Sequence, residues 1–150
     1  MSQADASHFN VLASEIVFTS GGTEADNLVL QSAVKDLKVT HIVTSKIEHH
    51  AVLHTVEQLA LDYKIKVSYV TVLADGTIDY SHLETLLDST EKTLVSLMHI
   101  NNEIGTILDI QKAADLCKSN NALFHSDSVQ SVGHYHLDLQ TIPIDFLAAS

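Results

Sequence analysis

The sequence predicts an α/β fold in which helices cover both faces of a mostly parallel sheet. Segments with strand character alternate with segments of helical periodicity along the 150 residues. This order is typical of parallel strands joined by crossover helices. Several strand candidates are continuous apolar runs, as expected when both faces of a strand are buried. We therefore expect one doubly wound unit of three layers, α/β/α.

Six strands are expected, each a short apolar run bounded by polar residues or glycine. In chain order they span residues 15–19, 41–44, 67–72, 93–98, 122–125 and 144–148. Ser20-Gly21-Gly22 breaks the first strand, and Asp75-Gly76 turns the chain after the third. Such glycine-containing breaks are typical turn signals.

Four helices are expected from apolar residues at i, i+3, i+4 spacing. The first spans residues 24–37, and the second begins near His49. The third opens at a Ser81-x-x-Glu84 pattern, which is typical of a capping box. The fourth carries Ile110 and Cys117 on one apolar face. Cys117 is therefore predicted to be a buried structural thiol instead of a nucleophile.

The net charge of the chain limits the kinds of partner that it is expected to bind. There are 8 basic and 19 acidic residues, a formal net charge of -11. Nucleic-acid and anionic membrane surfaces require clustered Lys and Arg, so neither partner is expected. A single cysteine cannot form an internal disulfide. No apolar run approaches the ~18 residues of a spanning helix, and Met1 to Phe9 lacks the plan of a signal peptide. A cytoplasmic location is expected.

Three loops that follow strands could carry chemistry, because open α/β sheets bind ligands at the carboxyl ends of their strands. In Ser20-Gly21-Gly22-Thr23, glycines precede a helix start, where free N–H groups and the helix dipole favour phosphate. A plain helix start explains this segment equally well. The loop of residues 99–105 contains Asn101, Asn102 and Glu103, which either bind a ligand or shape a turn.

The third loop is Glu48-His49-His50. His50 and His54 stand at i, i+4, but the acid of an H-E-x-x-H motif and a cysteine pair are both missing, so we expect no metal. A histidine at a helix N-terminus favours the neutral ring, which can stack on a flat ligand or accept a proton. Asp127 follows a further buried strand, and taken on its own it is better explained as a turn or cap aspartate than as a site residue.

Taken together, four motifs resemble those of the cysteine desulfurases, which are class V aminotransferase-like enzymes that use pyridoxal phosphate. The motifs are FTSGGTEADN at residues 18–27, Glu48-His49, HINNEIG at residues 99–105 and HSDSVQSVG at residues 125–133. The resemblance runs from about Glu15 to Ser150. It implies the large domain of fold-type I pyridoxal phosphate enzymes.

The resemblance also implies site residues. Thr23, with the Gly22 backbone, matches the phosphate anchor at the helix start. Ser150 matches the serine of the family's Ser-x-His-Lys motif, another phosphate contact.

The remaining matches concern the pyridine ring. His49 matches the histidine that stacks on the ring and can shuttle a proton. Asn102 and Gln130 match residues that bond near the ring hydroxyl. Asp127 matches the acid paired with the pyridine nitrogen, where an ionised carboxylate keeps that nitrogen protonated.

The implied reaction converts L-cysteine to L-alanine and leaves a persulfide on the enzyme, for iron–sulfur cluster assembly or tRNA thiolation. A homodimer and a sulfur-acceptor protein are implied partners. Selenocysteine lyase or another class V enzyme is the alternative within the class.

A non-catalytic scaffold or binding module is the alternative outside the class. The family's Schiff-base lysine would fall just after Ser150, and its nucleophilic cysteine later still. We therefore expect a partial large domain, without the family's N-terminal segment and small C-terminal domain. The 150-residue piece alone is expected to be inactive.

Overall fold

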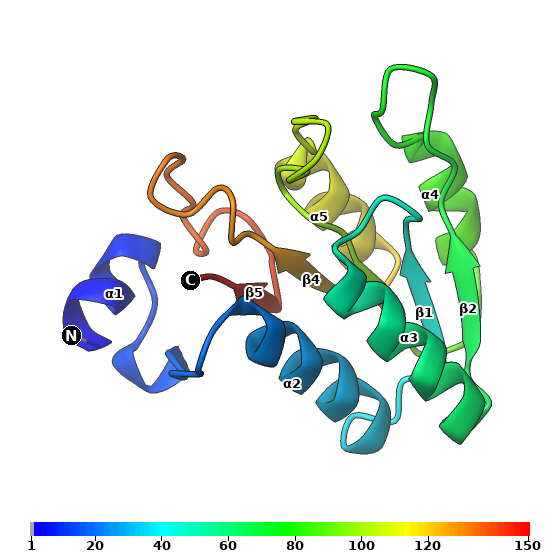
Figure 1. Ribbon diagram of the computed structural model, residues 1–150, viewed down its shortest axis with the longest axis horizontal. Helices are drawn as coiled ribbons and strands as arrows, with labels where there is room; N and C mark the ends of the chain where they lie inside the picture. Colours follow the sequence, from blue (N-terminus) through cyan, green and yellow to red (C-terminus); the bar gives the residue numbers. More distant parts are fainter. Residues whose placement is uncertain (1) are drawn as a thin grey trace.

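The computed structural model describes residues 2–150, which form a five-stranded parallel sheet flanked by helices (Figure 1). The strand order is β2-β1-β3-β4-β5, and every neighbouring pair is parallel. The strands are β1 (His41–Thr44), β2 (Lys66–Tyr69), β3 (Thr93–Ser96), β4 (Leu123–Asp127) and β5 (Phe146–Ala148). The predicted α/β class with a mostly parallel sheet is confirmed.

The helices are α1 (Ser2–Phe9), a 3₁₀ turn η1 (Ala13–Glu15), α2 (Gly22–Lys35), α3 (His50–Tyr63), α4 (Tyr80–Leu87) and α5 (Ile110–Ser119). All four predicted helices are present. Helix α1 was not among the helices predicted from the sequence. No helix within residues 2–150 combines the length and the apolar character needed to cross a bilayer.

Two separate apolar clusters make the core, one on each face of the sheet. Ile42 and Leu94 pack with α2 and α3, whereas Val43 and Val95 pack with α4 and α5. Successive residues of a strand point to opposite faces, so each central strand contributes to both clusters. This arrangement explains why the strand candidates are continuous apolar runs, and it confirms the three layers.

The strand predicted at residues 15–19 is wrong. Glu15 ends the η1 turn, and residues 16–19 pair with none of the five strands. Val17 and Phe18 are 70% and 64% exposed. An apolar run forms a strand only where a partner supplies the hydrogen bonds of the ladder, and this run has no partner among the described strands.

The capping box predicted at Ser81 is also wrong. Helix α4 begins at Tyr80, and Asp79 is its N-cap, with a carboxylate oxygen that accepts the His82 N–H at 3.1 Å. Ser81 therefore lies inside the first turn. Aspartate is at least as good an N-cap as serine, so the earlier residue starts the helix.

Several strand ends differ from the prediction. β2 ends at Tyr69, and Val72 instead forms an antiparallel bridge with Ile78 across the Gly76 turn. β3 ends at Ser96. β4 continues through Asp127 instead of stopping at His125, and β5 begins at Phe146 instead of residue 144.

Candidate active site

The loops at the carboxyl edge of the sheet are tied to the end of β4. The backbone N–H of His99 donates to the carbonyl of Asp127 at 2.9 Å, and the N–H of Ser128 donates to the carbonyl of Ala148 at 2.8 Å. The segment after β3 and the end of β5 therefore meet at Asp127, as expected for the ligand-binding edge of such a sheet.

Asp127 is a buried acid, 6% exposed, at the last position of β4. One carboxylate oxygen, Oδ1, accepts the Val129 N–H at 3.1 Å. Burial raises the pKa of this carboxyl, and the nearby Asp26 carboxyl raises it further, while the Val129 bond, His125 and His49 act in the opposite direction. A ligand with a cationic N–H facing Asp127 would offset the burial, so this carboxyl fits a protonated pyridine nitrogen.

The start of α2 packs directly on the turn that follows Asp127. A Cβ atom on Gly22 would lie 2.5 Å from Cγ2 of Val129, so only glycine allows this approach. Gly21 is the N-cap and makes no side-chain cap bond, and Thr23 is exposed on the first turn. The amide groups of this turn and the positive end of the helix dipole favour an anion such as phosphate.

His49 is the N-cap of α3. Its Nδ1 atom accepts the Ala51 N–H at 3.2 Å. In the neutral ring the proton therefore lies on Nε2, because the accepting nitrogen must be unprotonated. The ring is half-buried and lies 4.1 Å, between centroids, from the ring of His50. Nε2 is thus the nitrogen of His49 through which a proton would be transferred.

His49 and Asn102 face one open pocket of about 570 Å³. The pocket lies between the segment after β1 and the segment after β3. Its other lining residues are Lys46, Ile47, Glu48, His50, Leu53, Asn101, Glu103 and Ile104.

The other predicted site residues do not line this pocket. Gly22 and Thr23 lie at the start of α2, and Asp127 lies at the end of β4. Gln130 is exposed in the turn after β4, and Ser150 is exposed two residues beyond β5. The structure therefore gathers the predicted residues along one edge of the sheet, in two groups.

Buried polar side chains to which the sequence assigned no role also lie in this region, among them Asp26, His125, Ser96 and Glu48. Asp26 and His125 are fully buried, with 3.2 Å between Asp26 Oδ1 and His125 Nε2. Ser96 Oγ lies 2.8 Å from the other ring nitrogen, Nδ1 of His125. Glu48 directly precedes His49 and is 7% exposed. An acidic residue in the short loop between a buried strand and the next helix is the signal that could have singled out Glu48.

Cys117 is buried on α5, and burial raises the pKa of its thiol to about 12. Thiolates are the reactive form, so this cysteine is inert at neutral pH and structural, as predicted. Among residues 2–150, no three His, Cys, Asp or Glu side chains gather as a metal site requires. The rings of His50 and His54 lie 5.8 Å apart between centroids.

The family model described as aminotransferase class-V matches residues 4–150. The cysteine desulfurase IscS of Clostridium botulinum (strain Kyoto / Type A2) is 43% identical over 143 residues, which are 94% of this chain and 36% of the relative. The cysteine desulfurase IscS of Proteus mirabilis (strain HI4320) is 44% identical over 138 residues, 91% of this chain and 34% of the relative. The chain thus spans about a third of the length of these curated relatives.

Solved structures share the fold. A NifS-like protein superposes with a TM-score of 0.92 at 35% identity, and the match covers 99% of this chain and 42% of that protein. The structure titled SspA in complex with cysteine has a TM-score of 0.90 at 33% identity, covering 99% of this chain and 43% of SspA. The apo cysteine desulfurase of Thermococcus onnurineus NA1 has a TM-score of 0.90 at 28% identity, covering 99% and 37%.

Proposed function

The chain belongs to the class-V aminotransferase family, and from this premise we propose that it is part of a cysteine desulfurase that depends on pyridoxal 5′-phosphate. The observation that carries the proposal is the buried carboxyl of Asp127 at the end of β4, with the start of α2 packed on the next turn. An acid and an anion-binding helix start on one edge suit a ligand with a cationic ring and a phosphate. Relatives named cysteine desulfurase, 43% and 44% identical, support this choice within the family.

In the proposal, each predicted residue keeps its role. Asp127 pairs with the pyridine nitrogen, and Gly22 and Thr23 bind the phosphate through the first turn of α2. Asn102 and Gln130 approach the ring hydroxyl. Ser150 is a further phosphate contact.

His49 lies against the ring and moves a proton through Nε2, the nitrogen that its bond to Ala51 leaves free. When bound, pyridoxal phosphate withdraws electrons from the bonds at the substrate's α-carbon. The residues of this chain would hold the cofactor, and the negative charge on Asp127 would keep the pyridine nitrogen protonated, so that the ring withdraws electrons. The large-domain assignment is part of the same proposal.

The proposed substrate is L-cysteine and the proposed products are L-alanine and a persulfide on the enzyme, for iron–sulfur cluster assembly or tRNA thiolation. Because burial makes Cys117 inert, the sulfur-accepting cysteine is not this residue. A homodimer, a sulfur-acceptor protein and a cytoplasmic location complete the proposal.

Binding of pyridoxamine 5′-phosphate tests the proposed site without interference from surface lysines, because this amine cannot form a Schiff base with them. Titration calorimetry on the wild-type chain is expected to detect binding, and Asp127→Asn is expected to weaken it about tenfold or more, as the loss of a charge-assisted bond does. Asp115→Asn, an exposed change on α5, is the matched control. Equal affinities for wild type and Asp127→Asn would contradict the role of Asp127.

A further inference from the structure

Two segments face each other across the pocket that His49 and Asn102 line. We call residues 45–49, which follow β1, the β1 loop, and residues 97–105, which follow β3, the β3 loop. Each carries one proposed ring contact, His49 on the β1 loop and Asn102 on the β3 loop. The distance between the loops therefore sets the width of the site.

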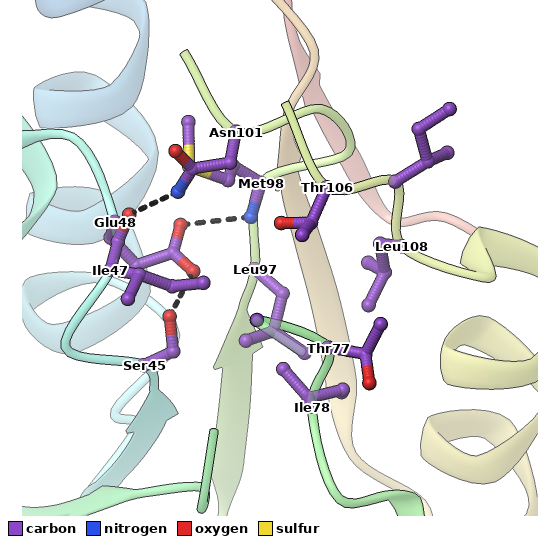
Figure 2. Close-up of a pocket in the computed structure, with 12 residues that line it drawn as sticks. Ser45, Ile47, Glu48, Thr77, Ile78, Leu97, Met98, Asn101, Thr106 and Leu108 are labelled. Carbon is purple, nitrogen blue, oxygen red and sulfur yellow. Dashed lines mark hydrogen bonds between the residues drawn. The ribbon is translucent and has the colours of Figure 1, made fainter. Parts of the chain in front are cut away.

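Glu48 fastens the β1 loop to the β3 loop. Its carboxylate oxygen Oε2 accepts the backbone N–H of Met98 at 2.8 Å, and the Ser45 hydroxyl lies 2.7 Å from Oε1 (Figure 2). The side chain thus reaches from the β1 loop to the start of the β3 loop, fifty residues away in sequence. Because the backbone of Glu48 is continuous with that of His49, this contact also limits where the His49 ring can lie.

Asn101 makes a second connection in the opposite direction. Its side-chain amide donates to the carbonyl of Ile47 at 2.7 Å (Figure 2). Its side-chain oxygen accepts the N–H groups of Glu103 and Ile104, each at 2.9 Å. These bonds span Asn102 and hold it at the exposed tip of the turn.

A second, much smaller cavity lies on the side of Glu48 that faces Thr77 and Leu97. The cavity bordered by Glu48, Thr77, Leu97 and Asn101 has a volume of about 20 Å³ (Figure 2). That is room for about one water molecule, so the side chain is closely packed on this side. Both Glu48 and Asn101 are buried, which limits the access of water to their bonds.

We propose that Glu48 and Asn101 are positioning residues that together fix the separation of His49 and Asn102 across the pocket. The consequence for the pyridoxal phosphate ring rests on the function proposed above. The pair acts through hydrogen bonds and not through a charge. Burial raises the pKa of the Glu48 carboxyl to about 8, an effect that the Asp127 and Asp26 carboxyls reinforce and the bonds to Ser45 and Met98 oppose. A neutral amide can therefore replace this side chain.

Affinity for pyridoxamine 5′-phosphate tests the effect on the site. Glu48→Ala and Asn101→Ala are each expected to weaken binding about tenfold, because each variant removes buried hydrogen bonds between the two loops. Glu48→Gln keeps an acceptor for Met98 and a donor for Ser45, so its affinity is expected to stay within about twofold of wild type. Leu87→Ala, a core change on α4, is the matched control for lost stability and should leave the affinity unchanged.

A double-mutant cycle separates positioning from general loosening. If Glu48 acts through His49, then Glu48→Ala should cost at most about twofold in a His49→Ala background, because coupled residues are not additive. An additive effect, or a Glu48→Gln variant as weak as Glu48→Ala, would overturn the proposal.

Nuclear magnetic resonance of the ligand-free chain tests the positioning itself. The His49 ring and the Asn102 side-chain amide should give the same signals in wild type and Glu48→Gln, and shifted or broadened signals in Glu48→Ala and Asn101→Ala. Unchanged signals in both alanine variants would overturn the proposal whether or not the ligand binds. Failure of the wild-type chain to bind the ligand would instead count against the proposed function.

Discussion

The close approach of α2 to the turn after β4 makes Gly22→Ala a sharp perturbation. The added Cβ would lie 2.5 Å from Cγ2 of Val129. Carbon atoms in good contact are about 3.5–4.0 Å apart, so α2 or Val129 must move by about 1 Å. Overpacking of this size costs about 1–3 kcal/mol. The better helix propensity of alanine returns at most about 1 kcal/mol. Subtracting the full gain leaves about 0–2 kcal/mol, so we expect a net destabilisation near the middle of that range, about 1 kcal/mol, measured by urea unfolding.

The same shift should also weaken ligand binding, because the N–H of Val129 donates to Asp127 Oδ1. Affinity for pyridoxamine 5′-phosphate is expected to fall together with stability. Gly21→Ala is the matched control. Nothing lies within 4 Å of a Cβ added there, so its effect should be confined to the small cost of a poorer N-cap, below about 1 kcal/mol.

Val129→Ala should relieve the clash. In the double variant the two changes are expected to couple by about 1 kcal/mol or more, since contacting residues are not additive. A Gly22→Ala chain as stable as wild type, with unchanged affinity, would refute the reasoning. Strictly additive stabilities of the two single variants would do the same.

Three further predictions concern pH and turnover. Glu48 has a folded-state pKa of about 8 against an ordinary 4.5. Its contribution to the free energy of unfolding is therefore complete below pH 4.5 and is lost as the pH rises through 8. The loss amounts to up to about 5 kcal/mol, at 1.36 kcal/mol per unit of pKa shift. Glu48→Gln should remove that part of the pH dependence of urea unfolding, whereas the exposed Glu57→Gln should not; parallel curves for wild type and Glu48→Gln would contradict this. Burial, and next Lys66, lower the pKa of His41, so its contribution to the free energy of unfolding is present above about pH 6.5 and is lost on acidification. His41→Gln, unlike the exposed His54→Gln, should flatten the acid side of the plot of stability against pH. An unchanged acid side would be evidence against this prediction. Finally, the pure 150-residue chain should release neither sulfide nor alanine from L-cysteine above a control with free cofactor, and clear release would disprove the expectation of inactivity.

The sequence was most informative where local and long-range requirements agree. The run His41-Ile42-Val43-Thr44 forms β1 with the predicted bounds, because an apolar run in the middle of a parallel sheet finds partners on both sides. Val17 and Phe18 have the same local character but no partner among the described strands, and pattern alone cannot reveal that difference. Helix starts were placed within a few residues, and the Asp79 cap was missed because two capping residues compete within one turn.

In the candidate site, too, some residues could be singled out from the sequence and others could not. Asp127 and His49 were singled out as candidates by their places after strands, and the resemblance supplied the roles proposed for them. Glu48 was missed as a connecting residue because its partner, the Met98 N–H, is a backbone group fifty residues away. The Asp26–His125 contact joins α2 to β4 over a still longer separation in sequence. Such pairs follow from the three-dimensional arrangement of the elements and from no local pattern.

The division of the core by the sheet has a practical consequence for engineering. The helix starts that carry Gly22 and His49 belong to α2 and α3, on one side of the sheet, while α4 and α5 pack on the other. Changes more than about 7–10 Å apart that share no partner combine independently. The solvent-facing surface of α4 and α5 can therefore be recoded for solubility, labelling or immobilisation while the carboxyl edge of the sheet, where the proposed site lies, keeps its native sequence.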